Sequence, residues 1–327
     1  MLAIDSYMAP LVCEVKQRFG QKAHVVFTVD LVPPHEPAAF YDAWCEAVRQ
    51  ADVIHLPSSS WQAYLQRDDP SSPLVQHAAK IQCLTYGIDP TTYEEEKQKV
   101  AGNSPDPEAY IAGKRKRKTN VQRRFGLAED QDAILVVVAN RWDLNNQKNN
   151  WLIAHHTPSL LVMQGGKAQL IIGNTSRDPT SQNPTLMTRL KSIAQDHPSQ
   201  MSIDGMDWAQ LLAAADMQLM PSKYEPCGLN HLQGMVMGVI PVCSKSGCMG
   251  EPPMIHNQNC FLFDWNPSSH QPPIDANDEF FDTLKQAVDT YVNSPQRWNE
   301  MVSHAMKDAN ESTWGNLASR YRDLLKV

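Results

Sequence analysis

The stretch Met220-Pro-Ser-Lys-Tyr-Glu225-Pro-Cys-Gly228-Leu-Asn-His-Leu-Gln-Gly-Met235 is the most informative part of this sequence. It follows a mostly apolar run, residues 215–220, that predicts a buried strand, and it leads into a helical pattern beginning near Leu229. The first N–H groups of a helix lack partners within it, so a strand, a tight turn and a helix start together favour anion binding. The acid Glu225 beside the turn can contact a polar ligand that also carries phosphates.

Outward from this stretch, apolar runs alternate with helical patterns along the chain, which predicts an α/β fold with parallel strands. Several runs are continuously apolar, as in strands covered by helices on both faces. The predicted strands are residues 24–29, 53–56, 81–86, 134–139, 169–172, 217–220 and 239–243, with a possible short strand at 2–4. The predicted helices include residues 40–51, 186–195, 208–214 and 230–237, with further helices after residue 297.

The length of 327 residues exceeds one ordinary domain and is sufficient for two. The polar stretch 93–127 separates two α/β units, so we expect a boundary near residues 128–132. Only three clear strands precede residue 93, which makes the first unit short for a complete doubly wound domain.

Composition excludes several classes of protein. No apolar stretch reaches the roughly 18 residues of a membrane-spanning helix, and the first residues lack the features of a secretory signal. The net charge of −7 argues against a general nucleic-acid binder. Seven cysteines without a Cys-x-x-Cys pair predict reduced thiols in a cytosolic setting and no zinc site.

One basic run, Lys114-Arg-Lys-Arg-Lys118 followed by Arg123-Arg124, opposes the acidic balance. We interpret it as a solvated helix face that ends at Phe125-Gly-Leu127. A docking patch for a polyanion and a targeting signal are the alternatives.

Further polar residues follow the predicted strands, where ligands of open α/β sheets bind. Arg141 ends one strand and Lys148 follows in the next loop, and two cations at such an edge can neutralise a diphosphate. Gly173 forms a turn after the following strand. Gly247 belongs to the loop after the strand that follows the Glu225 turn. The order and spacing of all these residues together predict the kind of site far more specifically than any single residue does.

These pieces resemble the motifs of the bacterial glycogen synthase and plant starch synthase family. Asn140-Arg141 with Gln147-Lys148 resembles the family's Ser-Arg-Leu … Gln-Lys-Gly, and residues 147–174 follow its pattern without a gap. Residues 216–238 resemble its "AD…PS-x-(F/Y)-EPCGL…G". Tyr86-Gly-Ile-Asp89 is similar to its Asn-Gly-Val-Asp, and Val26-Phe-Thr-Val-Asp30 to its Val-Phe-Thr-Val-His. Ala9-Pro-Leu11, after Asp5, resembles the segment that follows its His-Asp-Trp-His.

The resemblance implies a GT-B architecture of two Rossmann-like parallel-sheet domains, here with the N-terminal one incomplete. Residues 1–130 would form the partial acceptor-side domain, residues 131–310 the nucleotide-sugar domain, and residues 311–327 a helix returning to the first. The family transfers glucose from ADP-glucose, or UDP-glucose in some relatives, to the 4-OH of an α-1,4-glucan with retention. The nucleotide sugar is the donor substrate, and no separate cofactor or metal is implied. The expected location is cytoplasmic, or the plastid for a plant or algal source.

The resemblance also assigns roles to individual residues. Arg141 and Lys148 would hold the diphosphate, and Glu225 would bind glucose hydroxyls. Backbone N–H groups would come from Gly228, Leu229 and Asn230 at a helix start. Two further positions match family sites: Met206 stands where the family has an adenine-stacking aromatic residue, and Asp5 matches the acid of His-Asp-Trp-His.

Four departures from the family pattern leave two functions open. Asp30 replaces a histidine expected to line the sugar site, Cys248 replaces one glycine of a Gly-Gly-Leu loop, and Asn149 replaces the glycine after Gln-Lys. The family's Lys-x-Gly-Gly-Leu loop has no counterpart in this sequence, so a partner chain or a missing N-terminal segment would complete the first domain. One prediction is a glucosyltransferase; the other is a non-catalytic or fragmentary homologue that binds nucleotide sugar or glucan.

Cys227 is interpreted as structural, with a redox-sensitive thiol at a helix start as the alternative.

Overall fold

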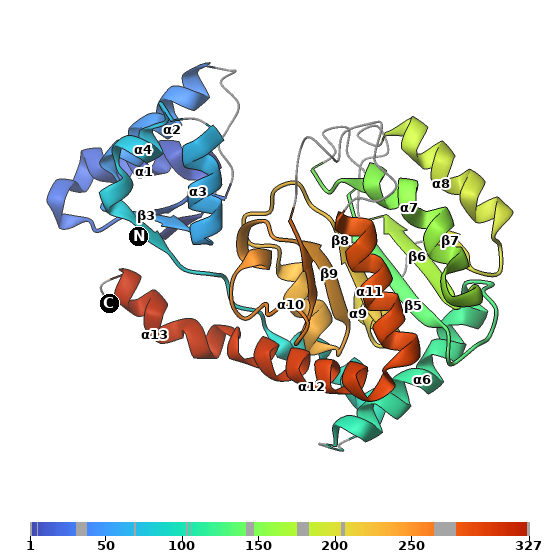
Figure 1. Ribbon diagram of the computed structural model, residues 1–327. Helices are drawn as coiled ribbons and strands as arrows, with labels where there is room; N and C mark the ends of the chain where they lie inside the picture. The colour runs from blue at the N-terminus through green and yellow to red at the C-terminus, as the bar shows by residue number, and fades with distance from the viewer. Residues whose placement is uncertain are drawn as a thin grey trace.

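The computed structural model describes residues 2–4, 6–30, 38–68, 70–102, 104, 106–141, 147–174, 183–203, 207–264 and 279–325. These residues form two separate sheets whose strands are all parallel. Figure 1 shows a smaller unit, in blue and cyan, beside a larger one that contains the remaining strands. The predicted α/β fold with parallel sheets is therefore confirmed.

The first sheet has the order β1-β2-β3-β4, and its strands are Leu2–Ile4, Val26–Thr28, Val53–Leu56 and Ile81–Cys83. The connecting helices are α1 (Ala9–Phe19), α2 (Ala38–Gln50), α3 (Ser59–Asp68) and α4 (Pro73–Gln76). A separate core fills this unit, with the fully buried Trp44 and Phe27 among its largest side chains.

The second sheet has the order β10-β9-β8-β5-β6-β7. In chain order its strands are β5 (Ile134–Asn140), β6 (Ala168–Asn174), β7 (Met201–Ile203), β8 (Met217–Met220), β9 (Ile240–Ser244) and β10 (Phe261–Phe263). The sequence did not predict β7 and β10, which are only three residues long and lie at the two edges. The helices that accompany this sheet are α7 (Asn150–Val162), α8 (Pro184–Asp196), α9 (Trp208–Leu212), α10 (Leu229–Val236) and α11 (Glu279–Asn293).

Four further helices are α5 (Glu94–Ala101) and α6 (Pro107–Arg124), which follow the first sheet in the chain, and α12 (Pro295–Glu311) and α13 (Trp314–Leu325), which follow the second. In Figure 1, α12 runs along the larger unit and α13 extends toward the smaller one, where both chain ends lie. The side chain of Leu324 packs against Val26 and Val53 of the first sheet. Tyr321 Oη donates to the carbonyl oxygen of Thr85 at 3.2 Å.

The basic run does form a helix, but the prediction that all of it is solvated is wrong. Lys114 and Lys118 of α6 are buried. Lys114 Nζ donates to the carbonyl oxygens of Met237 (2.6 Å) and Gly238 (3.1 Å), and Lys118 Nζ pairs with Asp216 Oδ2 at 2.6 Å. Their i, i+4 spacing places both lysines on the face that packs on the second sheet's unit, where backbone carbonyls and one carboxylate accept their hydrogen bonds.

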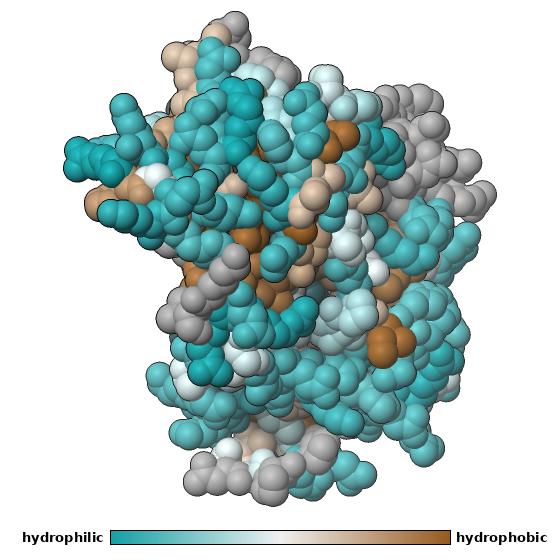
Figure 2. All heavy atoms as spheres, turned by 90° about the vertical axis from the view of Figure 1, so that its left-hand side faces the viewer, coloured by the Kyte–Doolittle hydropathy of each residue, from teal (hydrophilic) through white to brown (hydrophobic). Residues whose placement is uncertain are grey.

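The surface seen in Figure 2 is mostly hydrophilic, with hydrophobic residues gathered near its middle. Within the described part of the chain, no helix combines the length and apolar character that crossing a bilayer requires.

Candidate functional site

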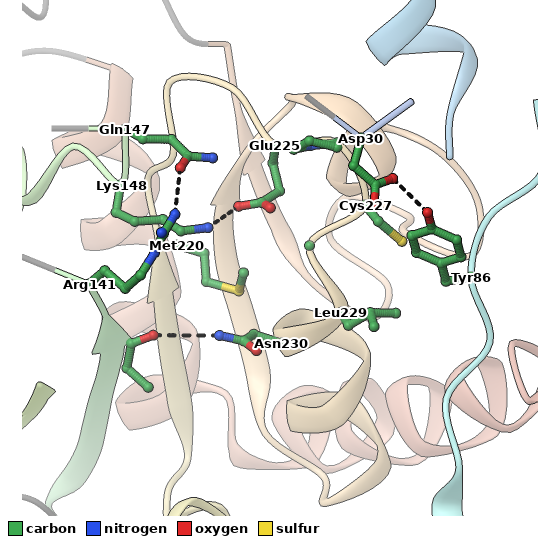
Figure 3. A pocket seen from close by; sticks show the side chains of 13 residues that line it. Asp30, Tyr86, Arg141, Gln147, Lys148, Met220, Glu225, Cys227, Leu229 and Asn230 are labelled. Atoms are coloured by element: carbon green, nitrogen blue, oxygen red, sulfur yellow. Dashed lines mark hydrogen bonds and ion pairs between the residues drawn. The ribbon is translucent and has the colours of Figure 1, made fainter. Parts of the chain in front are cut away.

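A cavity of about 490 Å³ opens at the carboxyl ends of β5 and β8. One wall comes from the second sheet's unit, and the facing wall comes from the loops after β2 and β4 of the first (Figure 3). The cavity is lined by Asp30, Tyr86, Ala139, Arg141, Gln147, Lys148, Met220, Glu225, Pro226, Cys227, Gly228, Leu229 and Asn230. Six of the residues predicted to bind the donor are among them: Arg141, Lys148, Glu225, Gly228, Leu229 and Asn230.

Hydrogen bonds hold the two cations of the cavity in place. Arg141 Nη2 donates to Gln147 Oε1 at 3.0 Å, and Gln147 Nε2 donates to the carbonyl oxygen of Tyr224 at 3.2 Å. Lys148 Nζ forms an ion pair with Glu225 Oε2, and both side chains are largely buried. The loop after β5 is thus tied to the loop after β8, with cations and a carboxylate side by side (Figure 3).

Asn149, which departs from the family glycine, keeps the backbone conformation that a glycine would allow. Its φ is +53°, in the left-handed region, immediately before α7. Asparagine adopts this region more readily than most side chains do. The replacement therefore preserves the turn that places Lys148 in the cavity.

The Glu225 turn depends on two glycines. Gly228 has φ +68°, and a Cβ there would lie 2.6 Å from Glu225 Cγ. Gly247 has φ +54°, and a Cβ there would lie 1.5 Å from the carbonyl oxygen of Glu225. Gly247 thus does not line the cavity but packs directly against the backbone of the turn. The buried His231 contacts the carbonyl oxygen of Gly228 through Nδ1, and burial lowers the pKa of this imidazole to about 4.

The other predicted site residues lie elsewhere. Gly173 stands in β6, where it pairs in register with Ala139, and it does not line the cavity. Asp5 and Met206 lie outside the described residues.

The facing wall contributes a carboxylate and a phenol. Tyr86 Oη donates to Asp30 Oδ1 at 2.6 Å. Burial raises the pKa of Tyr86 far above its usual range, and the neighbouring Asp30 charge raises it further. Asp30 thus lies in the cavity as its place in the Val-Phe-Thr-Val-Asp motif suggested, and it adds negative charge there.

Sequence analysis did not assign Tyr86, Gln147 or Met220 to the site. Tyr86 and Gln147 both belong to motifs that carried the resemblance, so their positions in those motifs could have identified them as site residues. Met220 is the last residue of β8, and only the sheet order shows that it reaches the cavity. Across the residues described, no cluster of three or more His, Cys, Asp or Glu side chains could hold a metal ion.

Comparisons with known proteins agree with this geometry. A protein named glycogen synthase from Glaesserella parasuis serovar 5 is 28% identical over 253 residues, which are 73% of this chain and 47% of that protein. Another from Syntrophotalea carbinolica is 28% identical over 84% of this chain and 55% of its own length. The chain spans about half the length of the curated relatives it matches. No family model matches it.

Solved structures show the same fold. The catalytic domain of Starch Synthase IV from Arabidopsis thaliana, bound to ADP and acarbose, superposes with a TM-score of 0.76 at 19% identity. The match covers 99% of this chain and 72% of that one. The Anabaena protein HepE in complex with UDP-glucose gives a TM-score of 0.70 at 16% identity, covering 99% and 78%.

Proposed function

We propose, from the premise that this chain is a GT-B relative of the glycogen and starch synthases, that its cavity binds a nucleoside diphosphate glucose. The donor would be ADP-glucose or UDP-glucose, and the acceptor an α-1,4-glucan that receives glucose with retention. The observation that carries the proposal is that Arg141, Lys148, Glu225 and the start of α10 meet in one cavity. Solved structures of the same fold that are bound to ADP or to UDP-glucose support it.

The charges of the cavity suit such a donor. Arg141 and Lys148 would neutralise the diphosphate and stabilise the charge that develops on it as the sugar leaves. The N–H groups at the start of α10 would add to that stabilisation. Glu225 would accept hydrogen bonds from sugar hydroxyls. The leaving diphosphate would help to deprotonate the acceptor on the same face of the sugar.

The Lys148–Glu225 ion pair would rearrange when the donor binds. A buried carboxylate without a partner costs several kcal/mol, and Lys148 supplies that partner to Glu225 before binding. A diphosphate oxygen can then replace the carboxylate as the partner of Lys148, while sugar hydroxyls replace the ammonium as the partner of Glu225.

The proposal includes a partner for the first unit, because the region matched by this chain covers only 47% of its glycogen synthase relative from Glaesserella parasuis. Among the described residues β1 pairs with β2 alone. Tyr7, Met8, Leu11 and Phe19, on or just before α1, are exposed hydrophobic side chains. A partner chain or a further N-terminal segment that covers them would complete the acceptor side of the cavity.

A second candidate function is nucleotide-sugar or glucan binding without turnover. The observation that favours it is the Asp30 carboxylate, held by Tyr86 in the cavity where the family has a histidine. A carboxylate cannot donate a hydrogen bond as an imidazole can, and it repels phosphate.

Calorimetry with ADP, UDP and ADP-glucose tests the donor site. We expect ADP or UDP to bind, and Arg141→Ala to weaken binding roughly tenfold or more, as for a lost charge-assisted hydrogen bond. Arg123→Ala is the matched control, because Arg123 is exposed on α6 and pairs with Glu129. Failure of every nucleotide to bind would refute the proposal.

Incorporation of labelled glucose into glycogen separates the two functions. A glucosyltransferase should incorporate label, and Glu225→Gln should abolish incorporation. Nucleotide binding without incorporation, even when the N-terminal portion of a relative is supplied, would favour the binding protein.

A further inference from the structure

Two cysteines meet at the edge of the cavity, where the two units touch. Thr85 Oγ1 lies 3.7 Å from Cys227 Sγ and 3.6 Å from Cys248 Sγ. Cys227 lines the cavity and so can be reached by a small oxidant, although both residues are mostly buried. Both thiols therefore contact the same hydroxyl group.

The backbones that carry these cysteines are in contact. Gly247 packs against the carbonyl oxygen of Glu225 so closely that no Cβ fits between them. Cys248 Sγ lies 3.5 Å from the carbonyl oxygen of Pro226, the residue immediately before Cys227. A disulfide requires two Cα atoms about 4.4–6.8 Å apart, and these contacts place the two segments that carry the cysteines side by side.

The two thiols differ in pKa, as disulfide formation requires of an attacking thiol and a resolving thiol. The neighbouring Cys248 thiol lowers the pKa of Cys227, and hydrogen bonds from the Tyr86 backbone and from Thr85 lower it further, although burial opposes the shift. The Cys227 thiol and burial both raise the pKa of Cys248. A thiolate is the attacking species in thiol oxidation, and a neighbouring thiol resolves the product.

Four other cysteines of the described residues lack this combination. Cys243 and Cys260 are also neighbours, but both are fully buried away from the cavity, and burial raises the pKa of each. Cys13 and Cys83 are more accessible, yet burial raises their pKa values too, and their thiols donate to the oxygens of Ala43 and Gln62.

We propose that Cys227 and Cys248 form a reversible disulfide that closes the candidate donor site under oxidising conditions. With a peroxide as oxidant, the Cys227 thiolate attacks one peroxide oxygen and becomes a sulfenic acid, while the other oxygen leaves and takes up a proton as water or an alcohol. Cys248 sulfur then attacks the sulfenic sulfur and releases water. The two thiols lose two electrons and the peroxide gains them.

The disulfide would alter the cavity because Cys227 stands between two of its functional groups. Glu225 and Gly228 lie on either side of it in the same turn, and Gly228 already has a constrained left-handed backbone. Cys248 would also lose its hydrogen bond to the carbonyl oxygen of Pro57, a contact with the first unit at 3.2 Å. The effect on ligand binding rests on the proposed function, whereas the disulfide does not.

Peroxide treatment of the full chain, followed by intact-mass measurement and peptide mapping, tests the disulfide. We expect the mass to fall by two hydrogen atoms. Peptide mapping should find one cross-linked peptide pair, which contains Cys227 and Cys248, and dithiothreitol should reverse both changes. Cys248→Ser should prevent the cross-link. Cys83→Ser, the matched control, should leave it unchanged.

Calorimetry with ADP tests the consequence. The oxidised chain should bind ADP roughly tenfold or more weakly than the reduced chain, with affinity restored on reduction, and oxidised Cys248→Ser should keep its affinity. Two results would contradict the proposed disulfide. One is a sulfinic acid on Cys227 without a cross-link, and the other is oxidation of Cys13 before Cys227 and Cys248. A cross-linked chain with unchanged ADP affinity would contradict the proposal that the disulfide closes the donor site. Absence of ADP binding by the reduced chain would instead refute the donor site and leave the mass measurement to decide the disulfide.

Discussion

Single residues at the cavity are constrained mainly by backbone contacts. Gly247 is the clearest example, because its Cα faces the carbonyl oxygen of Glu225 with no room for a side chain. Gly228 is constrained by the Glu225 side chain itself. Both glycines have left-handed φ angles, so the shape of the Glu225 turn is determined by two residues that contribute no functional group.

Gly247→Ala is expected to displace the Glu225 turn, because its Cβ would overlap a backbone atom that cannot rotate away. The expected loss in the free energy of unfolding exceeds about 3 kcal/mol, together with loss of nucleotide binding in any folded fraction. Urea denaturation and calorimetry measure the two effects. Gly20→Ala is the control: its φ is +52° but no atom lies within 4 Å, so it should cost only about 1 kcal/mol.

At the scale of elements, α6 and α10 are joined by a buried lysine. Lys114 Nζ donates to carbonyl oxygens at and just after the C-terminal end of α10, where helix carbonyls lack internal partners. Burial lowers the pKa of Lys114 to about 7, although Asp216 opposes the shift. The unfolded chain holds this proton up to about pH 10.4.

Between these two pKa values the unfolded state therefore binds more protons, and the free energy of unfolding rises with pH. From pH 7 to pH 9 wild type should gain about 2 kcal/mol relative to Lys114→Met, measured by urea denaturation at each pH. The exposed Lys116 on the same helix supplies the control, and Lys116→Met should show no such trend. A wild-type advantage over Lys114→Met that is constant with pH would contradict the assignment.

At the scale of the whole molecule, the two units meet beside the cavity through α3. Tyr224, next to Glu225, stacks with Trp61 and Tyr64 of α3 at centroid distances of 5.9 and 5.7 Å. Glu251 Oε1 accepts hydrogen bonds from Ser59 Oγ at 2.7 Å and from the Ser60 backbone N–H at 2.5 Å. A carboxylate from the second unit thus caps the first turn of a helix in the first.

Removing this cap should loosen the junction. Glu251→Ala is expected to cost about 1–2 kcal/mol and to accelerate hydrogen exchange at the Ser60 amide, read by mass spectrometry of peptides from the start of α3. Asp264→Ala breaks the exposed Lys245–Asp264 ion pair of the same unit and should have little effect. Unchanged exchange in Glu251→Ala would show that the Glu251 hydrogen bonds do not hold the start of α3 in place.

Much of this architecture could be predicted from local patterns. Residues 134–139 are continuously apolar because β5 is buried along its whole length, and Arg141, which follows β5 directly, was placed correctly at the sheet edge. The edge strands β7 and β10 escaped prediction because three residues are too few to show a period; β2 and β4, which are equally short, were predicted only as parts of the longer runs 24–29 and 81–86. Lys114 and Lys118 were misassigned because a charge run resembles a solvated face until the carbonyls that accept its hydrogen bonds are known.

The sequence by itself determined the parallel α/β fold and the motif that joins Glu225 to the start of α10, because buried strands, turns and helix starts depend on neighbouring residues. Tertiary structure alone decided what faces that motif. Asp30 and Tyr86 come from a different sheet, Gly247 packs against Glu225 from a later turn, and Thr85 of the first unit contacts both Cys227 and Cys248. Such contacts join residues far apart in the chain, and their geometry depends on how two sheets pack together.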